Sequence, residues 1–195
     1  MTDTKQPEKK KHKVPTAHDT FVKFMWKDIA RAKTMLRLCL PTEVAAKCNL
    51  EELRLEDGSF VDPDQSAKHS DIIYSTALGA RAVRLHVVWE HKSASSWRTT
   101  LQSAGYVLRG LERYADGEGK RSKTLPLTMS VVLHHSKKGW RAPTELLEMY
   151  GAGAKENPEV VPWLLNFRIA LFDLSHKSDE ELRASALDLA SLLAM

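Results

Sequence analysis

Hydrophobic and polar residues alternate most clearly between residues 69 and 93. The runs over residues 69–75 and 83–93 are rich in β-branched and aromatic residues, which favours strands. A break centred on Gly79 separates them, so we predict two neighbouring strands joined by a tight turn. Strand residues two apart share a face, so the second strand has an apolar face and a mainly polar one. The first comprises Val83, Leu85, Val87 and Trp89, and the second comprises Arg84, His86, Val88, Glu90 and Lys92.

A helical pattern precedes these strands. Apolar residues at helical spacing run from Thr16, where Thr16 and Asp19 form a capping-box-like signal, to Leu40. Pro41 either ends this run or starts a short second helix through residues 44–46. One face of the long helix should lie on the sheet.

Further elements follow in a simple order. Extended pieces are expected around the Asp-Gly turn at residues 57–58. After the two strands, a serine at 95–96 can cap a helix that continues to the glycine-rich break at 117–119. A strand follows over residues 125–135. The predicted order is α-β-β-β-α-β, which indicates an α/β fold.

The last part of the chain is typical of an acidic helical region. The apolar run over residues 163–174 predicts a helix, and Ser178 with Glu181 predicts a capping box that opens a final helix. Apolar residues of that final helix indicate a homodimer through the C-terminal helices. They are Leu189, Leu192 and Leu193. We divide the chain into a disordered basic tail over 1–14, a core domain over 15–141 and an acidic helical extension over 142–195.

Composition excludes several classes of protein. The chain has 195 residues, of which 43% are hydrophobic and 28% charged, as in a soluble domain with a real core. No apolar run approaches the roughly 18 residues that span a bilayer, and the N-terminus lacks the apolar core of a signal peptide, so we expect a cytoplasmic protein. Cys39 and Cys48 form no C-x-x-C motif, which argues against a structural zinc site.

Two acidic residues and a lysine form the candidate catalytic group. Glu90 and Lys92 project from the end of an apolar strand, and Asp71 on the adjacent strand brings a second carboxylate into reach. Two carboxylates suit a hard cation such as Mg²⁺, or Mn²⁺ in its place. This D…E-x-K arrangement resembles that of the PD-(D/E)XK nucleases. The resemblance implies that Asp71, Glu90 and the His91 carbonyl hold the metal, while Lys92 acts on the attacking water or the developing charge.

Other residues offer a supporting role beside a structural one. Gln102 and Tyr106 share a helical face and resemble the Q-x-x-x-Y pattern that supports the metal site in exonuclease-like members of that superfamily. Tyr106 could instead be a core residue. Asp19 and His18 either face the metal from the first helix or, as we favour, cap it. Three histidines leave a choice between metal or phosphate contact and a structural role: His86, His134 and His135.

Charge is distributed unevenly along the chain. Residues 92–141 carry ten basic and three acidic residues, whereas residues 142–195 carry four basic and nine acidic ones. The tail over 1–13 adds five lysines against two acidic residues. A phosphate backbone would run along such a basic excess, although a solvated face is the alternative. The candidate DNA contacts, expected at one set of strand and helix ends, are Lys120, Arg121, Lys123, Lys137, Lys138 and Arg141.

Several linked segments resemble the Rpn family of recombination-promoting nucleases, also called YhgA-like putative transposases. They lie at residues 15–23, 40–43, 50–62, 70–74 (SDIIY), 89–93 (WEHKS) and 131–135 (VVLHH). The resemblance covers about residues 15–141 and implies the restriction-endonuclease-like α-β-β-β-α-β core of the PD-(D/E)XK fold. Lys92 and Ser136 stand where that family usually has Gln and Gly. Lys92 matches the wider superfamily, whereas Ser136 leaves the turn after the last strand less defined.

These patterns predict a Mg²⁺-dependent DNA endonuclease that hydrolyses phosphodiester bonds. The family resemblance links it to DNA recombination or mobile elements. The alternative is a catalytically inactive DNA-binding or assembly module that keeps the nuclease fold. A third reading, hydrolysis of another phosphoester, predicts a pocket instead of an open basic groove.

Overall fold

The structure is a computed structural model that describes residues 27–56, 70–90, 95–134, 136–175, 177–178 and 180–181. At residues 70–71 and 86–90 it describes the backbone and the strand pairing, without the side chains. Several predicted features lie outside the described residues. They are the basic tail, the helix start at Thr16, the candidates His18 and Asp19, the turn at 57–58, and His91, Lys92 and His135.

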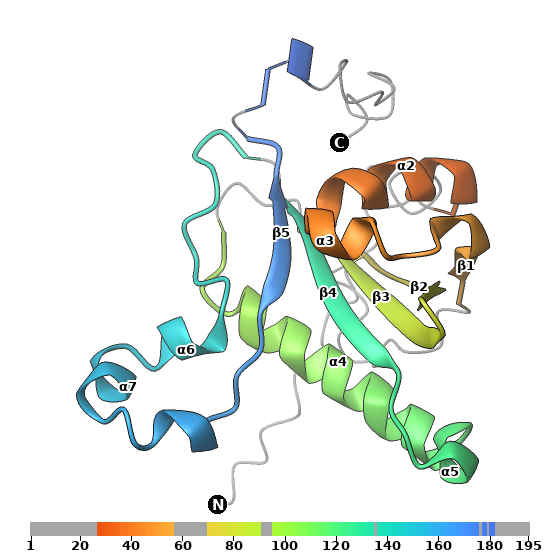
Figure 1. Cartoon of the computed structure of the whole chain (residues 1–195). Helices are drawn as coiled ribbons and strands as arrows, with labels where there is room; N and C mark the ends of the chain where they lie inside the picture. The colour runs from red at the N-terminus through yellow and green to blue at the C-terminus, as the bar shows by residue number, and fades with distance from the viewer. Residues whose placement is uncertain are drawn as a thin grey trace, which may run out of the picture.

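Five strands form one mixed sheet in the order β1-β2-β3-β4-β5. They are β1 (Arg54–Leu55), β2 (Ser70–Leu78), β3 (Arg81–Glu90), β4 (Leu127–His134) and β5 (Ile169–Asp173). The first three strands are antiparallel neighbours, and β3, β4 and β5 run parallel to one another (Figure 1). The predicted α/β class is therefore confirmed as a mixed sheet with helices.

Strands β2 and β3 form the hairpin that the alternation predicts. Their register pairs Leu78 with Arg81 beside the turn and Ser70 with Trp89 at the other end. Gly79 in the turn has a φ of 58°, a left-handed conformation that glycine adopts without a steric penalty. The predicted break at Gly79 is therefore the turn of the hairpin. Strand β2 ends at Leu78 and β3 begins at Arg81, so both strands lie closer to the turn than predicted.

One face of the sheet packs against helix α2 (Ile29–Cys39). Val83 and Leu85 of β3 are buried there, as the alternation predicts. The other strands and α2 contribute a continuous set of buried residues to this cluster, including Ala32, Leu36, Tyr74, Val131 and Leu133. Burial of these apolar side chains holds α2 on the sheet.

Helix α2 begins later than its sequence pattern predicts. Asp28 is its N-cap, with an extended backbone and a carboxylate oxygen that accepts the N–H groups of Ala30 (2.9 Å) and Arg31 (3.3 Å). A side chain that bonds the first-turn N–H groups starts a helix. The predicted helix from Thr16 to Leu40 therefore does not run through residue 28. Short helix α3 (Thr42–Ala45) follows Pro41 near the position expected for a second helix.

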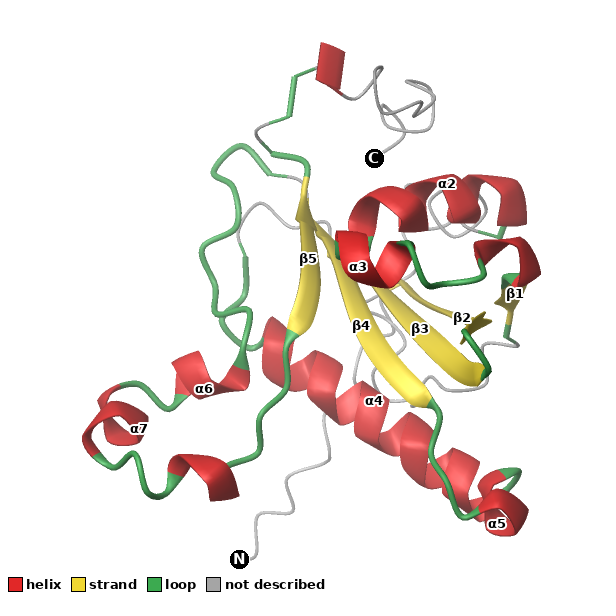
Figure 2. Ribbon diagram, viewed as in Figure 1, coloured by secondary structure: helices red, strands yellow, loops and turns green. Residues whose placement is uncertain are grey.

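Helix α4 (Thr99–Asp116) connects β3 to β4 and lies on the opposite face of the sheet from α2 (Figure 2). The Arg84 guanidinium on that face lies 4.7 Å from the centre of the Tyr114 ring of α4. Arg84 Nε also lies 3.2 Å from Glu56 Oε1, so this arginine joins the helix, β3 and the end of β1. The helix begins at Thr99, after the predicted cap: Ser96 Oγ accepts the N–H of Arg98 at 3.3 Å.

The helix predicted within residues 163–174 is wrong. Residues Ile169–Asp173 form β5, which pairs with β4 in the sheet. Between β4 and β5 the chain forms α6 (Leu146–Met149), α7 (Ala152–Glu156) and the 3-10 turn η2 (Val161–Trp163). A short continuous apolar run is typical of a buried parallel strand as well as of a buried helix, so periodicity alone does not separate them.

The predicted capping box after β5 is confirmed. Glu181 Oε2 accepts the Ser178 N–H at 2.7 Å, and Ser178 Oγ accepts the Glu181 N–H at 3.2 Å. The helix expected beyond it, with the predicted dimer contacts, lies outside the described residues. Where helices are described, none is long and apolar enough to cross a membrane.

Candidate active site

The strand register places Asp71 and Glu90 on the same face of the sheet. Asp71 pairs with Val88 across the antiparallel hairpin, and directly paired residues share a face. Glu90 lies two residues beyond Val88 and therefore shares that face. The two acidic residues are diagonal neighbours, whose Cα atoms are about 7–8 Å apart in such a pair. The backbone thus places both carboxylate-bearing residues at the end of β3, on the face that also carries α4.

Two further polar residues extend this row across the parallel strands. Glu90 pairs with His134 of β4, and His134 pairs with Asp173 of β5. Paired residues on neighbouring strands lie on one face, so Glu90, His134 and Asp173 form a row at the C-terminal ends of three strands. We call these three residues, with Asp71, the acidic row. In a parallel sheet this edge is the usual place for ligand sites.

His134 is fully buried within the row. Its Nε2 lies 2.9 Å from Ser136 Oγ, and its ring packs edge-on against Trp140 at a centroid distance of 5.0 Å. The Ser136 N–H also donates to Ser175 Oγ at 2.8 Å. The serine at this unusual position therefore bonds both His134 and the end of β5, while Gly139, with φ of 71°, supplies the left-handed residue of the turn.

Asp173 was not among the candidates because its segment was interpreted as a helix. Its Oδ2 accepts the Trp140 N–H at 2.7 Å and its Oδ1 accepts the Ser175 N–H at 2.9 Å. Burial raises the pKa of the Asp173 carboxyl, but the hydrogen bonds from Ser175 and Trp140 and the charge of His134 together lower it below its usual range. The sequence did contain a signal for Asp173, since it directly follows the short apolar run over residues 169–172, as an acidic residue at the end of a buried strand would.

Gln102 and Tyr106 lie on α4 beside its buried stripe. That stripe consists of Thr99, Thr100, Ser103, Ala104 and Val107. Gln102 and Tyr106 are both half-buried, and the Arg109 guanidinium carbon lies 5.0 Å from the centre of the Tyr106 ring. Tyr106 is therefore not a fully buried core residue. Contact of this pair with the metal site remains a prediction.

The candidate DNA contacts do not cluster at one set of element ends. Lys120 and Arg121 lie in α5 (Gly119–Ser122), and Lys123 follows it, all before β4 begins. Lys137, Lys138 and Arg141 follow the last residue of β4, near the acidic row. The eight residues of β4 span about 25 Å, so the two basic groups lie at opposite ends of this strand (Figure 1). All six side chains are exposed.

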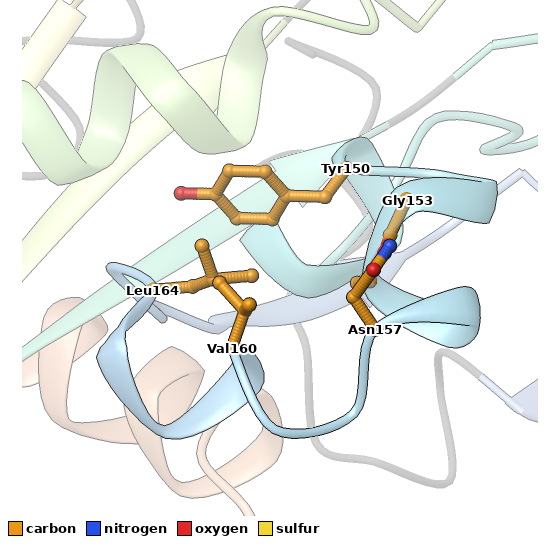
Figure 3. A pocket seen from close by; sticks show the side chains of 6 residues that line it. Tyr150, Gly153, Asn157, Val160 and Leu164 are labelled. Atoms are coloured by element: carbon orange, nitrogen blue, oxygen red, sulfur yellow. The ribbon is translucent and has the colours of Figure 1, made fainter.

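Two pockets formed by described residues lie away from the acidic row. One, of about 210 Å³, lies in the segment between β4 and β5 and is lined by Tyr150, Gly153, Ala154, Asn157, Val160 and Leu164 (Figure 3). Another, of about 340 Å³, surrounds the β2–β3 turn at the other end of the hairpin. Neither contains a residue of the acidic row.

The acidic row offers donor groups that suit a hard divalent cation. Carboxylate oxygens are the preferred protein ligands of Mg²⁺, and the strand register places Asp71 and Glu90 at diagonal positions on neighbouring strands. Among the residues whose side chains are described, no group of three or more His, Cys, Asp or Glu residues is close enough to hold a metal ion. That observation does not extend to Asp71 and Glu90, whose side chains are not described.

Comparison with known proteins shows the family to which the chain belongs. A model of the family described as "Putative transposase, YhgA-like" matches residues 16–195. The chain belongs to this family. Proteins named as recombination-promoting nucleases are among its relatives, so the resemblance to the Rpn proteins is confirmed.

Three relatives are similar to this chain at low sequence identity and over part of their own length. Recombination-promoting nuclease RpnC of Escherichia coli K12 is 25% identical over 86% of this chain and 53% of its own length. RpnD of E. coli O157:H7 is 26% identical over 86% of this chain and 62% of its own length. The inactive recombination-promoting nuclease-like protein RpnE of E. coli K12 is 26% identical over 62% of this chain and 39% of its own length. The chain therefore spans little more than half the length of the first two. No solved structure matches it significantly.

Proposed function

We propose that this protein is a metal-dependent DNA endonuclease of the PD-(D/E)XK type. The observation that supports this most directly is the β2–β3 register, which brings Asp71 and Glu90 to one face at the end of β3. The order α2, β1, β2, β3, α4, β4 is compatible with the restriction-endonuclease-like core that the family resemblance implies. Relatives named as recombination-promoting nucleases supply the link to DNA recombination.

The residues of the site divide the chemistry between them. Asp71, Glu90 and the His91 carbonyl would hold Mg²⁺, or Mn²⁺, against a phosphodiester oxygen. The cation, when bound, supplies the charge that polarises the phosphoryl group. Lys92 orients the attacking water or stabilises the negative charge that develops on the phosphate. Gln102 and Tyr106 would support this arrangement from α4.

The basic residues next to the row would bind the DNA backbone. Lys137, Lys138 and Arg141 are exposed and follow β4 directly, where the acidic row also lies. Phosphate contacts of this kind set affinity and register but carry little sequence information.

A catalytically inactive DNA-binding or assembly module is the second candidate. A relative named as inactive, RpnE, shares 26% identity with this chain. The two candidates share the fold and the basic surface and differ in metal binding and turnover.

Plasmid nicking in the presence and absence of Mg²⁺ tests the proposal. The wild-type protein should nick supercoiled DNA with Mg²⁺ and stop when the metal is chelated. Asp71→Asn and Glu90→Gln should abolish both cleavage and the metal-induced rise in melting temperature, because each removes a carboxylate ligand. Glu159→Gln, at an exposed position away from the row, is the matched control. Full cleavage by Glu90→Gln would rule out this active site, and DNA binding without metal binding would favour the inactive module.

A further inference from the structure

The pocket of about 340 Å³ at the turn between β2 and β3 lies at the opposite end of β3 from the acidic row. We call it the turn pocket. Small side chains of the two strands and the turn leave the space, and three charged residues complete the wall. The small residues include Ala77, Ala80 and Ala82, and the charged ones are Glu52, Arg54 and Arg81. A hollow of this size holds a small ligand or one group of a larger ligand.

Neither arginine of the turn pocket has an ion-pair partner in the part of the chain that the structure describes. Arg54 and Arg81 are both exposed. The carboxylates of Glu56 and Glu118, on neighbouring segments, both pair with Arg84, at 3.2 Å from its Nε and 3.9 Å from its Nη2. A guanidinium group has five N–H donors and no acceptor. The two pocket arginines therefore offer their donors to an anionic ligand.

The hydroxyl groups of the turn pocket already have partners. Thr76 Oγ1 donates to the carbonyl oxygen of Asn49, and the Ser75 hydroxyl forms a hydrogen bond with the Glu56 carboxyl. Glu52 is the acidic residue in the pocket lining, so the two arginines leave a formal charge of +1. Guanidinium groups match the oxygens of a phosphate with paired N–H donors, which favours a phosphate group as the ligand.

Further basic residues lie at the same end of the sheet. Strands β3 and β4 are parallel, with Val83 opposite Leu127, so the residues before β4 lie beside the start of β3 (Figure 2). The ion pair between Arg84 and Glu118 also joins β3 to the residue directly before α5. Exposed basic residues in and after α5 are Lys120, Arg121 and Lys123. A DNA backbone bound along α5 therefore passes the end of the sheet that contains the turn pocket.

We propose that Arg54 and Arg81 bind a phosphate group of the DNA backbone in the turn pocket. This inference rests on the proposed function, in which DNA is the substrate. Two guanidinium groups that line one hollow hold a single phosphate between them, whereas the basic residues of α5 contact the backbone along an exposed surface. Glu52 weakens the binding, because its negative charge repels the phosphate. A free nucleotide carries the same chemical group, and the experiments below separate the two sources.

Substitutions of opposite charge effect test the turn pocket with duplex DNA. The double variant Arg54→Gln, Arg81→Gln should flatten the log–log salt slope by about 0.9 and bind about eightfold more weakly at about 0.1 M salt, because one phosphate contact is lost. Glu52→Gln should bind more tightly than wild type. Filter binding across a salt series measures both effects, and melting temperatures show that the variants fold. Unchanged affinity and slope in the double variant would overturn the proposal.

A matched control removes the same amount of charge elsewhere. Arg31 and Arg168 are exposed, and they pair with Asp28 and Glu145. Their double replacement by Gln should leave DNA affinity within about twofold of wild type, since exposed charges beyond a Debye length are largely screened. An equal loss of affinity in both double variants would show an effect of net charge alone and overturn the turn pocket as a site.

A second measurement uses the wild-type protein. An arginine-specific reagent, followed by mass spectrometry, should modify Arg54 and Arg81 in the free protein, and bound duplex should protect both. Arg168 should react equally in the two states. Modification of the pocket arginines that duplex DNA leaves unchanged contradicts the proposal. Protection by deoxyadenosine monophosphate without protection by duplex would assign the pocket to a free nucleotide and overturn its role in DNA binding.

The outcomes distinguish this inference from the proposed function. If Mg²⁺-dependent nicking requires Glu90 but the Arg54 and Arg81 double variant binds DNA as wild type does, only the turn pocket fails. If that variant loses DNA affinity but the wild-type protein does not nick DNA with Mg²⁺, the phosphate site is supported and the nuclease function fails.

Discussion

At the scale of single residues, the side chains at the end of β5 hold the turn that follows β4. The Asp173 carboxylate accepts the N–H of Trp140, 33 residues earlier in the chain, and the N–H of Ser175, two residues later. Hydrogen bonds to a charged group contribute about 1.5–3 kcal/mol each, more than bonds between neutral groups. Asp173 is therefore a structural anchor of the candidate site as well as a member of the acidic row.

The lowered pKa of Asp173 predicts a specific dependence of stability on pH. Because its pKa is lower in the folded than in the unfolded protein, its contribution is fully present above about pH 4 and is lost as the pH falls from there through the folded-state value. Asp173→Asn should therefore be less stable than wild type at pH 7, by about 1–3 kcal/mol, with the difference shrinking at lower pH. Urea unfolding from pH 7 to pH 3 measures this, with exposed Asp116→Asn as the control. A difference that stays constant with pH would contradict the assignment.

Substitution of Lys92 should affect the nicking rate but not metal binding, unlike substitution of Asp71 or Glu90. The Lys92 ammonium group would act on the reacting water or on the developing charge and not on the metal. We expect Lys92→Ala to keep Mg²⁺ affinity, measured by calorimetry, while the nicking rate falls by about 10²-fold or more. Loss of Mg²⁺ binding in this variant would show that Lys92 is part of the metal site in another way.

At the scale of elements, β4 separates two basic groups that the sequence suggested were one. Lys137, Lys138 and Arg141 follow the strand beside the acidic row, while Lys120, Arg121 and Lys123 precede it at the far end. A DNA backbone that crosses the row is expected to contact the first group during cleavage. The second group would bind the same DNA backbone farther from the row, near helix α5.

Replacement of each group by Gln separates binding from cleavage. Both triple variants should bind DNA with a flatter salt dependence, by about 0.9 in log–log slope for each lost phosphate contact. Only the variant at 137, 138 and 141 should also lose nicking rate at saturating DNA, because its residues place the scissile phosphate. Filter binding across a salt series and nicking at saturation measure the two effects. Unchanged slopes in both variants would remove these surfaces from DNA binding.

At the scale of the whole molecule, β5 makes the region after residue 141 part of the sheet. Its residues pair with β4 from Ser130 to His134, and Val132 and Ile169 are buried in a shared cluster. Removal of β5 would leave β4 as an exposed edge and uncover the buried residues at its centre. Such an edge is prone to pair with other chains.

Two truncations test this dependence. A chain that ends at residue 141 should aggregate or unfold without a cooperative transition, because it lacks β5 and the Asp173 bonds to the turn. A chain that ends at residue 178 keeps β5 and should retain a cooperative thermal transition. Circular dichroism melting and size-exclusion chromatography measure both. A melting temperature of the shorter chain equal to that of the longer one would show that residues 142–178 are dispensable for folding.

The sequence alone determined the elements whose signals are local. The alternation at 83–89 and Gly79 predicted the hairpin of β2 and β3, because strand faces and turns depend on neighbouring residues. The same alternation, with one acidic residue on each strand, predicted that Asp71 lies on the strand next to Glu90, and the register of the hairpin places the two residues on one face. Ser178 and Glu181 likewise predicted a capping box, since its two hydrogen bonds span only three residues.

Only the tertiary structure decided how distant segments combine. The apolar run at 169–173 became a strand because the edge of β4 offered backbone partners and burial on both faces, which no local pattern records. That pairing also brought Asp173 and His134 into one row with Glu90 and moved two basic groups to opposite ends of β4. Asp28 similarly begins α2 within the range of the predicted helix, because its carboxylate accepts the N–H groups of Ala30 and Arg31. Strand pairing across many residues thus determined the composition of the candidate site beyond its first two acids.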